Sequence, residues 1–230
     1  MAESIDRRAV YNRRRKKRRR KILLRRWTVF LLVAALLCGI GIGVHHYRAW
    51  KNAENRSAAG GRTIKIPEWI DVQLIHIHST ARTGKELETV KNIVIHYVGN
   101  PGSTAQNNRD YFDKDSTEVS SHFVVGLGGE IIQCVPLYER SAASNQRNKD
   151  SVSIEVCHPD EGGRFAEATY ASVVKLTAWL LHEYGLTEAD VIRHYDVTGK
   201  LCPLYYVQHE DAWTALKNDI GEQLHGIQNQ

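Results

Sequence analysis

The stretch Asn92-Ile-Val-Ile-His-Tyr-Val98 is mostly apolar and rich in β-branched residues, and it contains one histidine. A run of this length, followed by the turn signal Asn100-Pro-Gly102, predicts a buried central strand with His96 near its end. Apolar residues at helical spacing predict a helix over 169–184, which Gly185 ends. Further expected elements are strands at 74–78, 121–126, 130–135, 151–157 and 191–193, and helices at 104–114 and 207–224. Because strands and helices alternate, we expect an α/β fold with a mixed central β-sheet flanked by helices.

A second informative stretch is His194-Tyr-Asp-Val-Thr-Gly-Lys-Leu-Cys-Pro203. It brings the imidazole of His194 and the thiol of Cys202 close together along the chain. With His96 they make three good zinc ligands, and three protein ligands with a fourth position open are typical of a catalytic zinc. Lys200, in the same segment, is a ready electrophile. Hydrolysis is therefore the leading hypothesis, with Zn²⁺ as the expected cofactor.

Two further residues are candidates for the same centre. Glu155 lies in the otherwise apolar stretch Ser153-Ile-Glu-Val156. An unpaired buried carboxylate is costly, so such a residue is usually ion-paired, metal-bound or catalytic. We predict that Glu155 is the general base, with a structural ion pair as the alternative. His122, in Ser121-His-Phe123, is a fourth candidate, although a single histidine in a strand is more often a hydrogen-bonded core residue.

The N-terminal part of the chain differs sharply from the rest. Residues 1–26 contain 13 basic and two acidic residues, a net charge of +11, whereas the remainder contains 18 basic and 24 acidic residues, a net charge of −6. The pI near 9.0 therefore describes the tail, and we expect no nucleic acid partner. Residues 27–44 contain no charged residue, and their number fits the roughly 17–25 residues of a transmembrane helix. An uncleaved anchor is expected there, with a cleaved signal as the alternative.

The basic cluster also predicts the orientation, because basic residues stay on the cytoplasmic side of a membrane span. We expect a single-pass protein of the cell membrane with a cytoplasmic tail at 1–26 and its folded domain outside the cytoplasm. Residues 45–66 are polar and are expected to be a linker, 67–222 the folded domain and 223–230 a C-terminal tail. Cys134 and Cys157 could form a disulfide in an exported domain or remain two buried thiols.

Taken together, the motifs and their order are more restrictive than any one of them. In chain order they are Asn92-Ile-Val-Ile-His-Tyr-Val-Gly-Asn-Pro101, Val119-Ser-Ser-His-Phe-Val-Val125, Gly129-Glu-Ile-Ile-Gln133, Asn148-Lys-Asp-Ser-Val-Ser-Ile-Glu155 and Arg193-His-Tyr-Asp-Val-Thr-Gly-Lys-Leu-Cys-Pro203. With these motifs the chain resembles the zinc-dependent N-acetylmuramoyl-L-alanine amidases of the type 2 class, which include phage lysozyme-like amidases and are related to animal peptidoglycan recognition proteins. The resemblance covers about residues 67–222.

The resemblance implies a role for each residue of the predicted centre. It implies that His96, His194 and Cys202 bind zinc. Lys200 lies at the position of the lysine that stabilises the oxyanion, and Glu155 at the position of the general base in many members.

The chain departs from the family pattern at two places. Some members have a tyrosine where this chain has Ser121, so that catalytic role has no occupant here. Many members carry a histidine in an Ala-x-His-x-Gly segment, whereas the matching Ser141-Ala-Ala-Ser-Asn145 has none. Asp196 is a candidate for orienting a ligand histidine or for forming a turn. Plausible contacts to glycan or stem peptide are Asn100, Asn145 and Asn148.

The expected function follows from these assignments. We expect a membrane-anchored, monomeric cell-wall hydrolase that uses a zinc-activated water to cleave the amide between N-acetylmuramic acid and L-alanine in peptidoglycan. The main alternative is a module that binds peptidoglycan without cutting it. The presence of Cys202 argues against that alternative, because related recognition domains lose the cysteine ligand. A membrane-tethered regulator with a nucleic-acid-binding tail is a third hypothesis.

Overall fold

The computed structural model describes residues 57–58, 62–77 and 79–229. They belong to one compact unit with its own hydrophobic core, as expected of a domain that folds by itself. Within these residues, no helix has both the length and the apolar character needed to cross a membrane. The predicted tail at 1–26 and the predicted span at 27–44 lie outside the described part of the chain.

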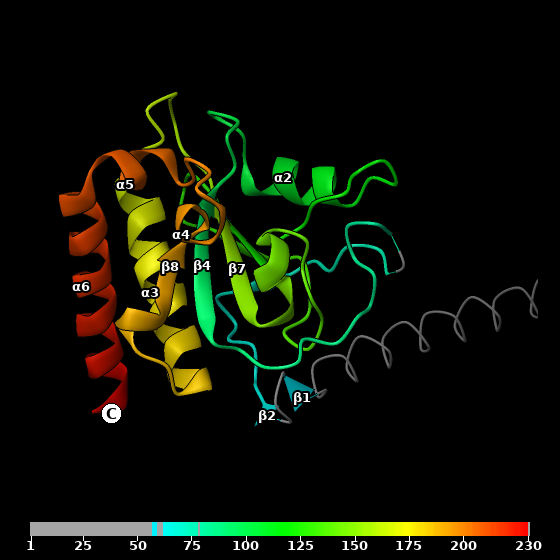
Figure 1. Ribbon diagram of the computed structural model, residues 1–230, viewed down its shortest axis with the longest axis horizontal. Coiled ribbons are helices and arrows are strands. Elements are labelled where there is room, and N and C mark those ends of the chain that lie inside the picture. Colours follow the sequence, from blue (N-terminus) through cyan, green and yellow to red (C-terminus); the bar gives the residue numbers. More distant parts are fainter. Residues whose placement is uncertain (1–56, 59–61, 78, 230) are drawn as a thin grey trace, which may run out of the picture. The chain divides into compact units, whose positions relative to one another are not determined.

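A mixed sheet organises the described domain (Figure 1). Its six strands follow the order β3-β6-β5-β7-β4-β8, and every neighbouring pair is parallel except the β5–β6 hairpin. The hairpin turns through Gly129, whose φ of +86° is readily available to glycine. A separate two-stranded sheet pairs β1 (Ser57–Ala58) with β2 (Arg62–Thr63). The strands of the main sheet are β3 (Asp71–Val72), β4 (Asn92–Tyr97), β5 (Phe123–Val125), β6 (Ile131–Gln133), β7 (Ser151–Val156) and β8 (Val191–Arg193). The predicted mixed α/β fold is confirmed.

One face of the sheet carries the main core. Alternate residues of a strand point to opposite faces, so Ile93 and Ile95 of β4 pack in the same cluster as α3 (Glu167–Tyr184) and α6 (Glu210–Gln228). Figure 1 shows these two helices side by side on one side of the sheet. Helix α3 ends at Gly185, which adopts the left-handed conformation typical of a helix C-terminus.

The other face carries a smaller cluster beneath α2 (Ala105–Phe112). Val124 and Phe112 are buried there together with the thiols of Cys134 and Cys157, both of which are free. Helix α2 begins with a capping box in which the Thr104 side chain accepts from the third helical N–H. The even-numbered residues of β4 and the odd-numbered residues of β7 face this side, and the functional groups described below are among them.

Two predicted elements differ from the structure. The predicted helix at 207–224 is instead α5 (Leu204–Gln208) followed by α6, with His209 in a non-helical conformation between them. The physical reason is Arg193, whose guanidinium donates to the Tyr206 carbonyl and to the Glu210 carboxylate. The Tyr206 carbonyl therefore accepts a hydrogen bond from a side chain outside the helix.

The strand predicted at 74–78 is also wrong, since β3 comprises only Asp71–Val72 and residues 74–77 form no strand. Arg109 donates to the carbonyls of Gln73 and Leu74, and Arg82 donates to that of Ile75. These carbonyls are bound by side chains, so they do not take part in a longer ladder. The apolar residues of this segment do not share a buried face, since Ile75 is buried and Ile77 is exposed.

Candidate metal centre

The candidate centre lies where three neighbouring parallel strands end. His96 is near the carboxyl end of β4, Glu155 is at the same level of β7, and His194 follows β8 directly as the first residue of α4 (His194–Thr198). The carboxyl ends of parallel strands are the usual place for ligands in α/β sheets. Cys202 follows shortly after α4. The sheet order β7-β4-β8 thus brings together side chains that are far apart in the sequence.

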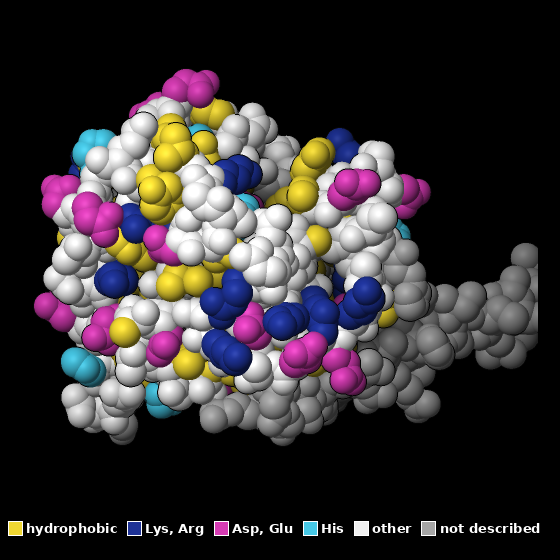
Figure 2. Space-filling model, viewed as in Figure 1, with side chains coloured by type: hydrophobic (Ala, Val, Ile, Leu, Met, Phe, Trp, Pro, Cys, Tyr) yellow, Lys and Arg dark blue, Asp and Glu magenta, His cyan; other side chains and the backbone are white. Residues whose placement is uncertain are grey.

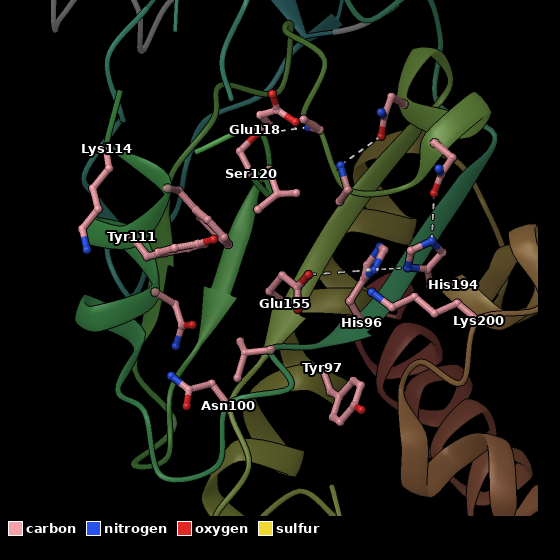
Figure 3. Close-up of a pocket in the computed structure, with 18 of the residues that line it drawn as sticks. His96, Tyr97, Asn100, Tyr111, Lys114, Glu118, Ser120, Glu155, His194 and Lys200 are labelled. Atoms are coloured by element: carbon pink, nitrogen blue, oxygen red, sulfur yellow. Dashed lines mark hydrogen bonds and ion pairs between the residues drawn. The ribbon is translucent and has the colours of Figure 1, made fainter. Parts of the chain in front are cut away.

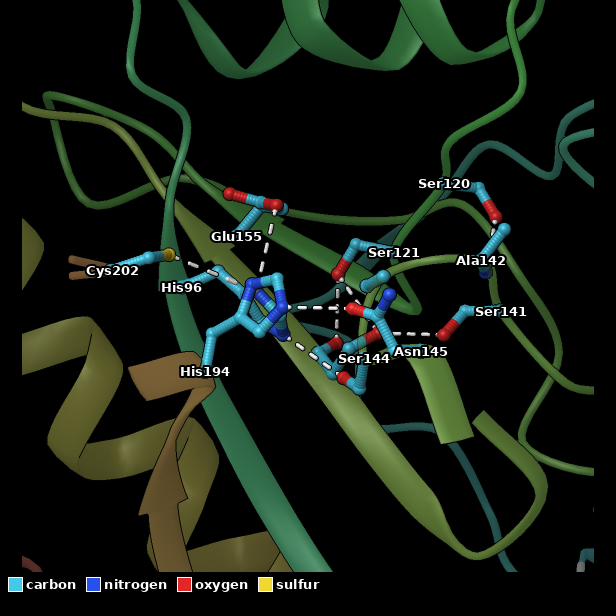
Figure 4. Close-up of polar contacts among 12 residues, drawn as sticks. His96, Ser120, Ser121, Ser141, Ala142, Ser144, Asn145, Glu155, His194 and Cys202 are labelled. Atoms are coloured by element: carbon cyan, nitrogen blue, oxygen red, sulfur yellow. Dashed lines mark hydrogen bonds and ion pairs between the residues drawn. The ribbon is translucent and has the colours of Figure 1, made fainter. Parts of the chain in front are cut away.

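Three of these side chains converge on one point (Figure 4). The Nδ1 atoms of His96 and His194 lie 3.1 Å apart, and the Sγ atom of Cys202 lies 3.9 Å from Nδ1 of His96. All three donor atoms lie within 4.8 Å of one another. His96 and Cys202 are almost completely buried, and His194 is 6 % exposed.

The outer nitrogens of both rings have oxygen partners. Nε2 of His96 lies 3.0 Å from the hydroxyl of Ser144, and Nε2 of His194 lies 3.0 Å from Oδ1 of Asn145. An amide oxygen only accepts hydrogen bonds, so this contact favours the tautomer of His194 with its proton on Nε2 and a lone pair on Nδ1. Such a lone pair facing a second Nδ1 and a thiol fits a bound cation between them. Two imidazoles and a thiolate are a donor set that suits zinc.

Burial sets the protonation of these ligands. It holds the pKa of His96 well below its ordinary value and lowers that of His194, and the positive charge of Lys200 acts in the same direction. Both rings are therefore neutral at neutral pH, which is the form that binds metals. Burial raises the pKa of the Cys202 thiol to about 12, with the Glu155 carboxylate adding to the rise. A coordinated cation deprotonates a thiol by stabilising the thiolate.

Glu155 faces the same point from β7. Its Oε1 lies 3.9 Å from Nδ1 of His96, and its Oε2 is buried without a hydrogen-bond partner in the described part of the chain. Burial raises the pKa of Glu155 to about 8, and the positive charge of Lys200 opposes that rise. A buried carboxylate oxygen with no partner is costly. The Glu155 carboxylate is therefore placed to interact with a cation, a proton or a water molecule.

The centre opens into a cleft of about 1150 Å³ that runs towards α2 (Figure 3). Figure 3 shows Lys200 beside the two imidazoles and Tyr111 and Lys114 on the opposite wall. The cleft walls also include Asn100, Asn107, Glu118, Val119, Asn145, Asn148 and Thr198. Basic and acidic side chains are interspersed on the face of the molecule shown in Figure 2, in keeping with the modest net charge of this part of the sequence.

The structure places His122 away from this cluster. It is fully buried, its Nδ1 accepts from the Ser153 backbone N–H at 3.0 Å, and its Nε2 lies 3.0 Å from the Glu139 carbonyl. Burial lowers the pKa of His122 to about 4, partly opposed by the bond to that carbonyl. These contacts describe a neutral histidine beneath the site.

The other predicted residues are Asp196 and three asparagines. Asn100 lines the cleft. The Asp196 carboxylate accepts hydrogen bonds from the backbone N–H and the guanidinium of Arg193. Asn145 binds His194, and Asn148 accepts two backbone N–H groups of the turn before it. Sequence reasoning missed Ser144, which is fully buried against His96. A serine in a polar loop carries no local signal of such a contact.

Known proteins with similar sequences are amidases. The Amidase_2 family, described as N-acetylmuramoyl-L-alanine amidase, matches residues 86–204, which is just over half of the chain. The N-acetylmuramoyl-L-alanine amidase CwlL of Bacillus licheniformis is 29% identical over 167 residues, covering 65% of this chain and 46% of that protein. BlyA of Bacillus subtilis is 30% identical over 173 residues, covering 66% and 47%. The chain spans about half the length of the curated relatives it matches.

A solved structure extends the likeness to three dimensions. A mutant endolysin from Bacillus subtilis matches with a TM-score of 0.58 and 28% identity, covering 66% of this chain and 98% of that one. The matched part of the sequence contains the whole candidate centre, since residues 86–204 run from before β4 to beyond Cys202. The chain belongs to the N-acetylmuramoyl-L-alanine amidase family.

Proposed function

We propose that this protein is a zinc-dependent amidase that hydrolyses the amide between N-acetylmuramic acid and L-alanine in peptidoglycan. The observation that carries the proposal is the arrangement of three metal-binding side chains, His96, His194 and Cys202, beside the unpartnered carboxylate oxygen of Glu155. His96, His194 and Glu155 line one cleft that is large enough for part of a glycan and its stem peptide. A module that only bound peptidoglycan would need no such combination.

The donor set of this chain fits zinc, which would be held by Nδ1 of His96, Nδ1 of His194 and Sγ of Cys202. When bound, zinc acts as a Lewis acid that polarises the scissile carbonyl and acidifies a water molecule. Burial keeps both rings neutral, and the oxygen atoms that face Nε2 of each ring favour a proton there and a lone pair on Nδ1. This arrangement makes the site ready for the ion before substrate arrives.

Glu155 is the general base of the proposed reaction. Its carboxylate takes a proton from the attacking water and passes it to the nitrogen of the leaving L-alanine. The oxygen that does so has no competing partner in the described part of the chain, so it is available to the water. The positive charges of Lys200 and of a bound cation favour the ionised carboxylate that this role needs.

Lys200 stabilises the negative oxygen that forms when water adds to the amide carbon. Its side chain lies beside the imidazoles at the edge of the cleft, where the oxyanion would develop (Figure 3). A fixed positive charge at a developing oxyanion is usually among the largest contributions to catalysis. The ammonium also donates up to three hydrogen bonds, which suits a tetrahedral oxygen.

The N-terminal part places the proposed enzyme near its substrate. Residues 27–44 act as an uncleaved membrane anchor and the basic residues 1–26 stay in the cytoplasm, so the catalytic domain faces the cell wall. The domain acts as a monomer. Alkaline extraction of membranes and protease treatment of spheroplasts carrying the full chain test this arrangement. Retention in the membrane with a protease-accessible domain supports it, and a freely released protein contradicts it.

The decisive experiment for the activity uses purified residues 62–230 and purified peptidoglycan. Mass spectrometry follows the release of free L-alanine amino termini, with and without a zinc chelator. Release that stops on chelation and returns with added zinc is the expected result. A folded domain that binds one zinc ion but releases no L-alanine termini would contradict the amidase and favour a binding role.

A further inference from the structure

We propose that the turn Ser144–Asn145 is a positioning element for both histidine ligands of the metal centre. Each of its two side chains holds the outer nitrogen of one imidazole, which fixes the tautomer and the orientation of the ring. The inference rests on the proposed zinc centre and adds residues that do not themselves contact the metal. Both residues lie in the segment Ser141-Ala-Ala-Ser-Asn145.

The geometry is the same at both rings. The Ser144 hydroxyl lies 3.0 Å from Nε2 of His96, and Oδ1 of Asn145 lies 3.0 Å from Nε2 of His194. A carbonyl oxygen requires a proton on the nitrogen that it faces, so Asn145 selects the tautomer of His194 whose Nδ1 is free. The Ser144 hydroxyl, which can accept or donate, is available as an acceptor for a proton on Nε2 of His96. The two Nδ1 atoms then face each other at 3.1 Å with their lone pairs directed to the same point.

The turn is itself held in place. Oδ1 of Asn148 accepts from the backbone N–H groups of Ala143 at 3.1 Å and of Ser144 at 2.6 Å. Asn145 has a φ of +51°, in the left-handed region that asparagine tolerates better than most residues. A residue in this conformation persists where its surroundings hold it there. Two adjacent side chains are thereby directed at two rings whose residues lie 98 positions apart in the sequence.

Loss of either contact leaves a buried or partly buried ring N–H without a partner. Such groups cost free energy, and the ring is free to turn or to change tautomer. Partners of this kind typically contribute about 10–100-fold to metal affinity. The effect of removing Ser144 or Asn145 should therefore appear in zinc binding, whatever substrate the enzyme takes.

The first test measures the zinc dissociation constant of residues 62–230 by competition with a chromophoric chelator. Ser144→Ala and Asn145→Gly are each expected to weaken zinc binding by about 10–100-fold. Glycine relieves the left-handed backbone at 145, so the loss cannot come from backbone strain. Asn145→Asp keeps an acceptor oxygen and is expected to bind zinc within about threefold of the original protein.

Gln146→Ala is the matched control. It removes an amide from the same turn, together with a bond to the Val197 carbonyl in α4, but Gln146 has no bond to either ring among the described contacts. Its zinc affinity is expected to change less than about twofold. A loss in Gln146→Ala as large as that in Asn145→Gly would overturn the proposal, because general tethering of the turn would then explain the effect.

A second readout does not depend on metal. Nitrogen-15 NMR of the ring nitrogens in the zinc-free domain is expected to show the proton of His194 on Nε2, with a mixture of tautomers in Asn145→Gly. An unchanged tautomer together with unchanged zinc affinity in Asn145→Gly would overturn the proposal. A loss of zinc affinity in Asn145→Asp as large as that in Asn145→Gly would also overturn the proposal. Neither measurement involves peptidoglycan, so a failure of the amidase assignment would be recognised separately.

Discussion

His96 and Glu155 are paired in register on the neighbouring parallel strands β4 and β7. Residues paired in this way project from the same face of the sheet, which is why Oε1 of Glu155 lies 3.9 Å from Nδ1 of His96. The metal-ligand candidate and the general-base candidate are therefore held by the backbone ladder at the centre of the sheet. A site built on two central strands is fixed more precisely than one built on loops.

Glu155→Gln is expected to lower the rate of L-alanine release by about 10²–10⁴-fold, because an amide cannot take the proton of the attacking water. The shape of the side chain is kept, so zinc content measured by atomic emission should be unchanged. Glu222→Gln, on the exposed side of α6, is the matched control and should keep full activity. Residual activity above one tenth of the original in Glu155→Gln would exclude Glu155 as the base.

Lys200→Ala is expected to cost roughly 10²–10³ in turnover through loss of oxyanion stabilisation. Zinc should remain bound, since none of the three ligand atoms is altered. Lys149→Ala removes an exposed lysine from a nearby turn and should leave turnover unchanged. Steady-state kinetics on soluble muramyl peptides separates the two variants. Near-original turnover by Lys200→Ala would remove this lysine from the mechanism.

Removal of the metal should lower stability as well as activity. With free zinc at a hundredfold its Kd, binding stabilises the folded state by about 3 kcal/mol, or roughly 5–10 °C in Tm for a domain of this size. Calorimetry with and without chelator measures the shift. Cys202→Ala should bind no zinc, and its Tm should not change when chelator is added. Cys134→Ala, which removes another buried thiol, should keep both the zinc and the shift in Tm, and equal behaviour of the two variants would contradict the ligand assignment.

The stability of the domain should fall in mild acid because of His122. Its folded-state pKa is lowered to about 4 by burial, whereas an unfolded histidine has a pKa of about 6.5. Between these values only the unfolded state binds the proton, so stability decreases as the pH falls through this window and levels off below it. From neutral pH to about pH 5 the loss is about 2 kcal/mol.

Urea unfolding at both pH values measures this effect. His122→Gln should be less stable at neutral pH, since it disturbs two buried hydrogen bonds. Its loss of stability between neutral pH and about pH 5 should be about 2 kcal/mol smaller than that of the original domain. His225→Gln, at an exposed position of α6, should retain the full pH dependence. Identical pH profiles for the original domain and His122→Gln would show that another group is responsible.

Much of the fold could be predicted from local sequence patterns. The apolar run at 92–98 and the helix at 169–184 were recognisable because buried strands and amphipathic helices have characteristic periods, and Gly185 ends its helix for a local reason. The errors lie where a distant side chain satisfies the backbone. Arg109 and Arg82 bind the carbonyls that a strand at 74–78 would have used. Arg193 likewise separates α5 from α6.

The sequence by itself determined the chemistry of the centre. Two short motifs and one strand contain all of its side chains: two histidines, a cysteine, a glutamate and a lysine. Only the tertiary structure decided which atoms meet. The strand register places Glu155 beside His96, and the turn at Ser144–Asn145 binds rings 48 and 49 positions away. Ring orientation and tautomer depend on such distant partners, and no local period or spacing encodes them.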